Sequence, residues 1–446
     1  MTDRILLINY DFPPALSGVR RITKMARYLP LHGFEPMALA ATPHAHLPLD
    51  EQALAHDNLE ELPVWRTSPC DVEAARGLLM EARKKMRILR KKMDHEAPEA
   101  PTKAKSARRA TLMNPVRQTI RRLMTLPDDR WTWLATAIPM ADHIMRSRAV
   151  RYVMTSSYPH SSHLIGWYLK ERYNIHWHAD FRDGWTQNPY FADYITPLHR
   201  RLNHWLEAQV VKHADTLTAV SGPIADHLAT LTDNPRKVHL LPNGFDATDL
   251  DGLPDTPFEK FTIAYTGTMF MQRSPDSFFA ALRGLLDCYP GLAENIQVLF
   301  RSNIKPEHDT MLADLGLTGV VKNLGMGSWH DALTLQKNAD VLLLLEGENP
   351  NSHIMLTQKV FEYMATGKPI LAVAPPGALS NLIRRTKAGV VIHPDNVFRI
   401  KETLFELFLG RMNVEPRQDV VDLYTRQNQA DILAKILRGQ PYAQLY

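Results

Sequence analysis

A cation and a carboxylate stand three residues apart in the second half of the chain, in a stretch suited to a short helix. Lys359 and Glu362 follow Thr357, which can cap a helix, and precede Gly367 and Pro369, which can end one. Residues three apart share a helix face, and a cation nearer the N-terminus opposes the helix dipole. We therefore expect the pair to serve a ligand, with Lys359 and the helix start meeting phosphates and Glu362 accepting both hydroxyls of a ribose.

A second group of candidate ligand contacts follows an apolar run near the start of the second half. The segment 265–268 reads Tyr-Thr-Gly-Thr and ends a predicted strand with Thr268, and Arg273 comes shortly before the next predicted helix. A planar guanidinium binds phosphate oxygens in pairs. Arg273 is therefore placed to hold a diphosphate.

Polar residues also follow predicted strands in the first half. Gly18 lies between the first strand and a helix, where backbone N–H groups and the helix dipole suit a phosphate or a sugar hydroxyl. His160 and His163 belong to a cluster of Ser, Thr and His residues at 155–163, which leads into a helix predicted over 164–173. We expect the cluster to point into a cleft, with His160 as a capping or surface group.

His176, His178 and Asp180 alternate along another predicted strand and so share one of its faces. Metal-dependent hydrolases use this spacing for metal ligation, but Phe181 stands where a further His usually follows the Asp. We expect packing and hydrogen bonding for the two histidines and no metal site. A metal-dependent hydrolase stays an alternative.

The elements that must position these residues form a regular alternation. Apolar runs of strand length alternate with helical patterns in both halves, which predicts an α/β protein with two doubly wound, Rossmann-like domains. We expect the domains to face each other across a cleft, so that the carboxyl ends of both sheets reach one ligand. The predicted parts are an N-terminal domain (1–242) with an insertion (76–122), a hinge (243–260), a C-terminal domain (261–410) and a helical tail (411–446) that packs back on the N-terminal domain.

The net charge of +4 over 446 residues conceals an uneven distribution. The insertion 76–122 carries 15 Lys or Arg against 4 Asp or Glu, a net of +11, so the remainder of the chain carries −7. Two interpretations stay open: a solvated helical insertion, or a basic amphipathic element that lies on anionic membrane lipid. A nucleic-acid partner is disfavoured because the segment lacks interleaved aromatic residues for base stacking.

Cysteine usage and hydropathy indicate in which part of the cell the protein works. Cys70 and Cys288 are far apart and outside any CxxC pair, which disfavours a disulfide framework or a cysteine-based zinc site. No apolar run approaches the roughly 18 residues of a membrane span, and the first run meets Asp11 too early for a signal peptide. We expect a cytoplasmic protein, peripheral on the inner face of the cytoplasmic membrane if 76–122 binds lipid.

Five motifs, taken in order, resemble glycosyltransferase family 4. They are Asp11-Phe12-Pro13-Pro14 with Gly18, Ser161-Ser162-His163, Asp180-Phe181-Arg182-Asp183-Gly184-Trp185, Leu241-Pro242-Asn243-Gly244-Phe245-Asp246, and Lys359-Val360-Phe361-Glu362-Tyr363 with Gly367-Lys368-Pro369. The resemblance covers nearly the whole chain except the basic insertion. It implies the GT-B fold, a nucleotide-sugar donor on the C-terminal domain, an acceptor on the N-terminal domain, and transfer with retention of configuration, with neither a metal nor a further cofactor.

The resemblance also implies residue roles. His163 would lie beside the donor sugar, Asp183 or Asp180 would orient the acceptor, and Arg273 and Lys359 would neutralise the leaving diphosphate. The candidate catalytic residues are His163, Asp183 and Glu362, and the candidate donor-binding residues are Gly18, Asn243, Thr268, Arg273, Thr357, Lys359 and Glu362.

The sequence departs from the family pattern at two positions. Ile354 stands where the family has the first of two glutamates eight positions apart, and Thr268 stands where it has an arginine after glycine. The Asp-x-Asp at 249–251 lies in the predicted hinge, which disfavours a metal-dependent GT-A mechanism. We expect transfer to a lipid-linked or cell-surface glycan, with a nucleotide-sugar hydrolase or epimerase, or a noncatalytic membrane-bound scaffold, as alternatives.

Overall fold

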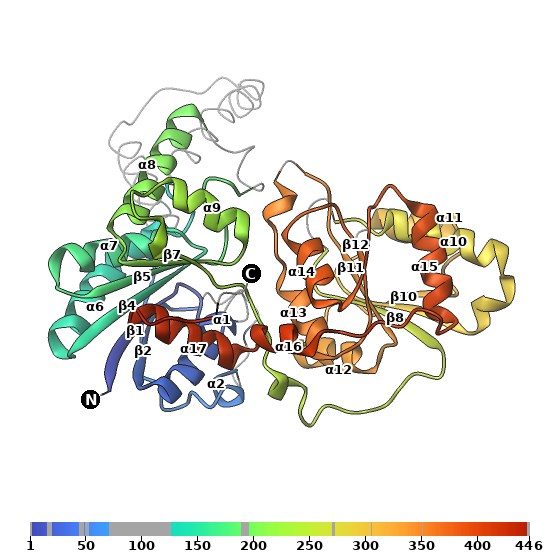
Figure 1. The fold of residues 1–446 in the computed structure, drawn as a ribbon, viewed down its shortest axis with the longest axis horizontal. Coiled ribbons are helices and arrows are strands. Elements are labelled where there is room, and N and C mark those ends of the chain that lie inside the picture. Colours follow the sequence, from blue (N-terminus) through green and yellow to red (C-terminus); the bar gives the residue numbers. More distant parts are fainter. Residues whose placement is uncertain are drawn as a thin grey trace, which may run out of the picture. The chain divides into compact units, whose positions relative to one another are not determined.

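The protein is built on two parallel β-sheets connected by helices (Figure 1). The structure is a computed structural model that describes residues 2–15, 20–43, 49, 53–70, 126–188, 196–269, 273–304, 306–349 and 351–443. The predicted site residue Gly18 and the basic insertion at 76–122 lie outside these described residues.

The first sheet has seven strands in the order β3-β2-β1-β4-β5-β6-β7. β1 pairs in parallel with β2 on one side and β4 on the other, so the direction of winding reverses between β1 and β4. Its strands are β1 (Asp3–Ile8), β2 (Phe34–Ala41), β3 (Val64–Thr67), β4 (Val150–Ser157), β5 (His176–Phe181), β6 (Thr216–Ala219) and β7 (Val238–Leu240). The α-helices described along this part of the chain are α1 (Arg20–Tyr28), α2 (Ala53–His56), α6 (Leu134–Ser147), α7 (Ser161–Arg172), α8 (Pro197–His213) and α9 (Gly222–Thr230).

The second sheet has six strands in the order β10-β9-β8-β11-β12-β13. β8 pairs in parallel with β9 and β11, which places the reversal between β8 and β11. Its strands are β8 (Phe261–Thr266), β9 (Ile296–Arg301), β10 (Val321–Asn323), β11 (Val341–Leu345), β12 (Ile370–Val373) and β13 (Gly389–Ile392). The α-helices described here are α10 (Asp276–Cys288), α11 (Pro306–Asp314), α12 (Trp329–Asn338), α13 (Gln358–Ala365), α14 (Ala378–Thr386), α15 (Val397–Phe408), α16 (Gln418–Val421) and α17 (Arg426–Leu437).

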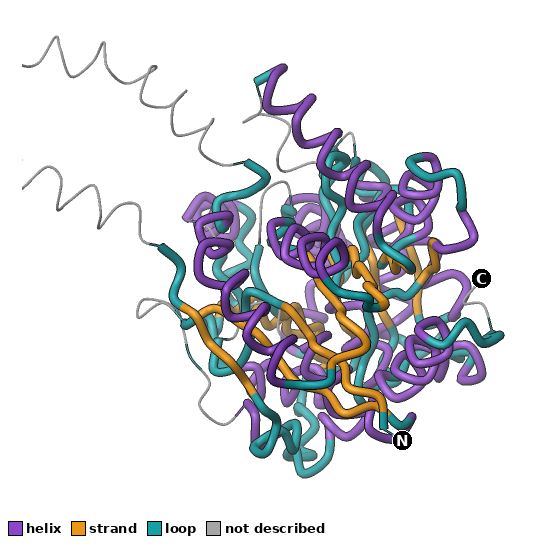
Figure 2. The backbone as a smooth tube through the Cα atoms, turned by 90° about the vertical axis from the view of Figure 1, so that its left-hand side faces the viewer, coloured by secondary structure: helices purple, strands orange, loops and turns teal. Residues whose placement is uncertain are grey.

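The second sheet is buried on both faces, which explains its unbroken apolar strands. In β11, Leu343 and Leu345 enter one hydrophobic cluster, whereas Leu342 and Leu344 enter another on the opposite face. Alternate residues of a strand point to opposite faces, so a strand covered on both sides must be apolar throughout. For the first sheet, whose side of the molecule faces the viewer in Figure 2, helices lie beside the strands. This arrangement confirms the prediction of two doubly wound α/β sheets.

By the grouping of internal contacts, the chain divides into two compact units. The first comprises Met1–Ile22, Gly33–Asp180 and Tyr190–Leu217, and the second comprises Thr23–His32, Phe181–Pro189 and Thr218–Tyr446. Within the described ranges, no helix combines the length and the apolar composition needed to cross a lipid bilayer.

Candidate functional site

Lys359 lies at the start of α13, next to the end of β8. Thr357 has the extended conformation of a helix N-cap (φ −67°, ψ 144°), as predicted, although its side chain makes no capping hydrogen bond. Lys359 Nζ donates a hydrogen bond to Tyr265 Oη at 2.8 Å and lies 4.2 Å from the centre of the Tyr265 ring. It also lies 3.4 Å from the carbonyl oxygen of Thr268. The helix start and the strand end therefore meet around one amino group.

Gly267 makes room for the Lys359 side chain. The glycine has φ +89°, a conformation that L side chains rarely adopt, and a Cβ placed on it would lie 2.5 Å from Lys359 Cε. The absence of a side chain at this position therefore lets the aliphatic part of Lys359 pack directly on the backbone.

Arg273 is held by a carboxylate at the reversal point of the second sheet. Glu346 directly follows β11, and its Oε2 accepts hydrogen bonds from Arg273 at 2.9 Å (Nη2) and 3.2 Å (Nε). The two side chains are only 13% and 4% exposed. Open α/β sheets bind ligands beyond the carboxyl ends of the strands at such a reversal. Arg273 is therefore in the part of the fold where a ligand is expected.

Burial and a neighbouring cation together shift the protonation of Lys359. Burial, together with the positive charge of Arg273, lowers the pKa of this lysine to about 7, while Glu346 and Glu362 act in the opposite direction. Removing an amine from water disfavours its charged form, whereas an anion beside it restores that form. The site thus holds an amino group that would take up a proton near neutral pH when an anionic ligand binds beside it.

The loop that carries Asn243 is tied to the start of α13. The carbonyl oxygens of the residues on either side of Asn243 accept hydrogen bonds from the side-chain amides of Gln429 (2.7 Å) and Gln358 (2.8 Å). The guanidinium of Arg426 donates to the side-chain oxygens of both glutamines at 3.0 Å. α17 therefore fixes Asn243, which is itself buried, close to the first turn of α13.

Asp183 and Ile354 line a small cavity of about 30 Å³ beside the segment that leads into α13. The carboxylate of Asp183 lies 3.7 Å from the guanidinium of Arg182. Ile354 is buried, and its Cδ1 lies 3.3 Å from the Cβ position of Gly184. At the position where the family pattern has a glutamate, this chain therefore places an apolar side chain against the Asp183 segment.

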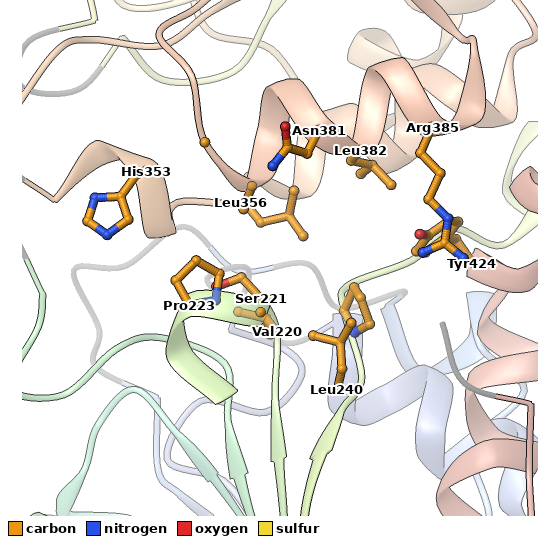
Figure 3. Close-up of a pocket in the computed structure, with 14 residues that line it drawn as sticks. Val220, Ser221, Pro223, Leu240, His353, Leu356, Asn381, Leu382, Arg385 and Tyr424 are labelled. Carbon is orange, nitrogen blue, oxygen red and sulfur yellow. The ribbon is translucent and has the colours of Figure 1, made fainter. Parts of the chain in front are cut away.

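A larger cavity of about 450 Å³ adjoins the small one, because Val220 and Leu356 line both. Figure 3 shows His353 on one side of it and Asn381 and Arg385, both from α14, on another. Most of the remaining lining is apolar. The second unit thus offers a partly open pocket beside the residues that precede α13.

His163 lies in the first turn of α7 in the first unit and is fully buried. Its Nδ1 is 2.8 Å from Thr155 Oγ1, which also accepts a hydrogen bond from Trp177 Nε1 at 2.9 Å. The indole can only donate, so Thr155 Oγ1 accepts from Trp177 while it lies within hydrogen-bond distance of the imidazole. Burial lowers the pKa of His163 to about 3 despite the opposing charge of Asp180, so the ring is neutral.

α7 begins earlier than predicted, at Ser161 instead of residue 164. Asp128 explains the difference, because its carboxylate accepts hydrogen bonds from the Ser161 backbone N–H (2.6 Å) and hydroxyl (3.0 Å). The expectation that His160 is a surface or capping group is wrong. His160 is 1% exposed, stands at the N-cap position without a side-chain capping bond, and packs edge-on against Tyr158.

The alternating residues of β5 have structural partners. The carboxylate of Asp180 accepts hydrogen bonds from Arg21 at 2.7 and 2.9 Å and from the Ser156 hydroxyl at 2.7 Å. His176 and His178 both contact Thr216 Oγ1, at 3.0 and 2.9 Å. The predicted packing and hydrogen-bonding roles of the two histidines are confirmed.

The structure thus brings together the predicted residues Asn243, Thr268, Arg273, Thr357 and Lys359 around α13, with Glu362 half-buried on the same helix and Asp183 near its leading segment. Sequence reasoning missed Tyr265 and Glu346. A carboxylate directly after an all-apolar strand is the signal that could have identified Glu346.

Comparison with known proteins agrees with this fold. Residues 17–244, just over half of the chain, match the family model of the glycosyl transferase 4-like domain. A D-inositol 3-phosphate glycosyltransferase of Salinispora tropica is 25% identical over 278 residues, which are 56% of each protein, so the chain spans about half the length of this curated relative.

Solved structures also resemble nearly the whole chain. Sucrose-phosphate synthase from Thermosynechococcus elongatus has a TM-score of 0.61 at 14% identity and covers 98% of both chains. Anabaena HepE in complex with UDP and glucose has a TM-score of 0.58 at 12% identity, over 98% of this chain and 100% of that chain. The chain has the GT-B fold and belongs to the glycosyl transferase 4-like family.

Proposed function

We propose that the protein is a retaining glycosyltransferase that moves a sugar from a nucleotide-diphosphate sugar to a lipid-linked or cell-surface glycan. The observation that carries this proposal is the pair of cations, Lys359 and Arg273, at the reversal point of the second sheet. Family membership and the likeness to HepE, whose structure holds UDP and glucose, support it.

The two cations suit the departure of a diphosphate. As the glycosidic bond breaks, the leaving diphosphate gains negative charge, and fixed cations in a partly buried site stabilise that charge. Arg273 would share its guanidinium between Glu346 and the diphosphate, while Lys359 would bind as an ammonium. These two side chains would supply the neutralisation without a metal ion or a further cofactor.

The other candidate donor contacts surround this pair. Glu362 would accept the ribose hydroxyls, the uncapped start of α13 after Thr357 would meet a phosphate, and Thr268 and Asn243 would complete the donor site. Gly18, outside the described residues, would contact the donor through its backbone.

Two further residues would act on the sugar and the acceptor. His163, kept neutral by burial, would lie beside the donor sugar, and Asp183 would orient the acceptor. Because Ile354 is apolar, recognition of the sugar would depend on its neighbours and on the adjoining cavities. We further propose that the protein works in the cytoplasm, on the inner face of the cytoplasmic membrane, where 76–122 would contact anionic lipid.

The proposal is tested by ligand binding and by turnover. In a thermal-shift screen against UDP- and GDP-sugars, the true donor at about 100 times its Kd should stabilise the protein by about 2.7 kcal/mol. Lys359→Met and Glu362→Gln should each abolish transfer from that donor to extracted glycolipids. Glu348→Gln, which changes an exposed acid of the same region, is the matched control and should keep full activity.

Normal transfer by either site variant contradicts the proposed roles. Turnover of the nucleotide sugar at an undiminished rate without any acceptor indicates a hydrolase or an epimerase instead. The anomeric configuration of the product, measured by NMR, tests retention, and unchanged activity in EDTA tests independence from metal.

A further inference from the structure

α8 exposes three large apolar side chains along one stripe. Leu198, Leu202 and Trp205 are 59%, 37% and 53% exposed, and spacings of four and three residues place them on the same helix face. No other helix in the described ranges exposes more than one large apolar side chain. Figure 1 shows α8 at the periphery of its domain, next to α7.

The helix is well anchored, so this exposure is not a frayed end. Its opposite face buries His199, Asn203 and Glu207, and the Thr196 hydroxyl caps the helix by accepting the His199 N–H at 3.2 Å. The helix also buries Val210 and Val211, so it is the exposed stripe of three large apolar side chains that departs from the pattern expected for a helix that faces water. Contiguous exposed apolar residues on a soluble domain mark interaction surfaces.

The exposed face is also cationic. Arg201 and Lys212 are exposed and stand at helical spacing next to the apolar stripe, four and seven residues from Trp205. The single acid of the helix, Glu207, is buried on the other side. Trp205 packs edge-on against Trp167 of α7, with ring centres 6.3 Å apart, which fixes its indole at the surface.

We propose that this face of α8 docks on an anionic lipid bilayer. Tryptophan and leucine side chains enter the boundary between headgroups and acyl chains, and flanking cations bind acidic headgroups. A second copy of the chain fits less well, because a twofold interface would bring Arg201 and Lys212 of both copies together. The segment 76–122 is disfavoured as the partner of this face because its net charge is also positive. The docking does not depend on the proposed transfer activity.

Vesicle co-sedimentation of the full chain tests the proposal. The parent protein should bind vesicles of phosphatidylcholine with 30% phosphatidylglycerol more tightly than vesicles of phosphatidylcholine alone. The double variant Arg201→Ser with Lys212→Ser should lose about thirtyfold in partitioning, since each cation contributes about 1 kcal/mol near such a surface. Leu202→Ser with Trp205→Ser should lose at least tenfold.

The matched control is Phe398→Ser with Lys401→Ser on α15, which removes an exposed aromatic ring and the cation 5.1 Å from its centre. It should bind vesicles within twofold of the parent. The variants change exposed side chains, apart from the half-buried Lys401 of the control, and thermal denaturation checks that each remains folded. Parent-like vesicle binding by both α8 variants overturns the proposal. A change of oligomeric state in the apolar variant with unchanged vesicle binding also overturns it, because the face then serves a protein interface.

Discussion

Binding of a nucleoside diphosphate should weaken as the pH rises from 7 to 9, because Lys359 must carry a proton to hold the ligand. Burial, with Arg273 nearby, lowers the pKa of this lysine from 10.5 to about 7 in the free protein. A diphosphate placed against the amine would raise that pKa again. Above pH 7, binding must therefore take up a proton from the solvent, and the affinity must fall as protons become scarce.

The size of the effect follows from the pKa. The charged fraction of an amine with a pKa of 7 falls from about one half at pH 7 to about one hundredth at pH 9. If the pKa of the bound form is 10 or higher, the affinity for UDP falls about fiftyfold over this interval, which corresponds to about 2.3 kcal/mol. The terminal phosphate of UDP, like other phosphate groups, titrates near pH 6 and contributes little to the change.

Isothermal titration calorimetry at pH 7, 8 and 9, in two buffers of different ionisation enthalpy, measures both the affinity and the proton uptake. Lys359→Arg is the informative control, because a guanidinium stays charged throughout this range and should bind UDP with little dependence on pH. Lys359→Met should bind weakly at every pH. A parent affinity that stays constant within threefold, without proton uptake, would refute the reasoning.

Two further predictions concern stability. Asp180→Asn should lower the free energy of unfolding by about 3 to 5 kcal/mol in urea titrations, because it leaves the charge of Arg21 buried beside a neutral amide; a loss below 1 kcal/mol would show that the ion pair is dispensable. Gly244→Ala should lower the stability by about 1 to 3 kcal/mol in thermal denaturation, because its Cβ would lie 2.1 Å from the Tyr424 carbonyl oxygen. Gly319→Ala, whose Cβ would lie in open space, should have little effect. Equal effects of the two substitutions would contradict this account.

The sequence was informative where local pattern and burial agree. The apolar run at 341–345 becomes β11 because both faces of that strand enter hydrophobic clusters. The helix predicted between Thr357 and Gly367 is α13, with Gly367 at φ +68° just after its end. These features depend on neighbours in the chain, so residue type and spacing were sufficient to predict them.

Contacts between distant segments could not be predicted in this way. Glu346 meets Arg273 only because β8 and β11 are neighbours in the sheet, although 73 positions separate the two residues. The start of α7 is set by Asp128, 33 positions earlier, and not by a residue of the helix itself. In both cases the partner of a charged or polar group is selected by the three-dimensional fold, which the spacing of residues along the chain does not reveal.

The bonds from α17 to the Asn243 loop have a consequence for biosynthesis. Gln429 binds the carbonyl oxygen of a residue 187 positions earlier, and Arg426 holds the same network together. A polypeptide leaves the ribosome from its N-terminus, and its domains begin to fold as they emerge. A nascent chain that has already formed the strands of both sheets would still lack the bonds that fix this loop. The candidate donor site therefore matures only after α17 has been synthesised.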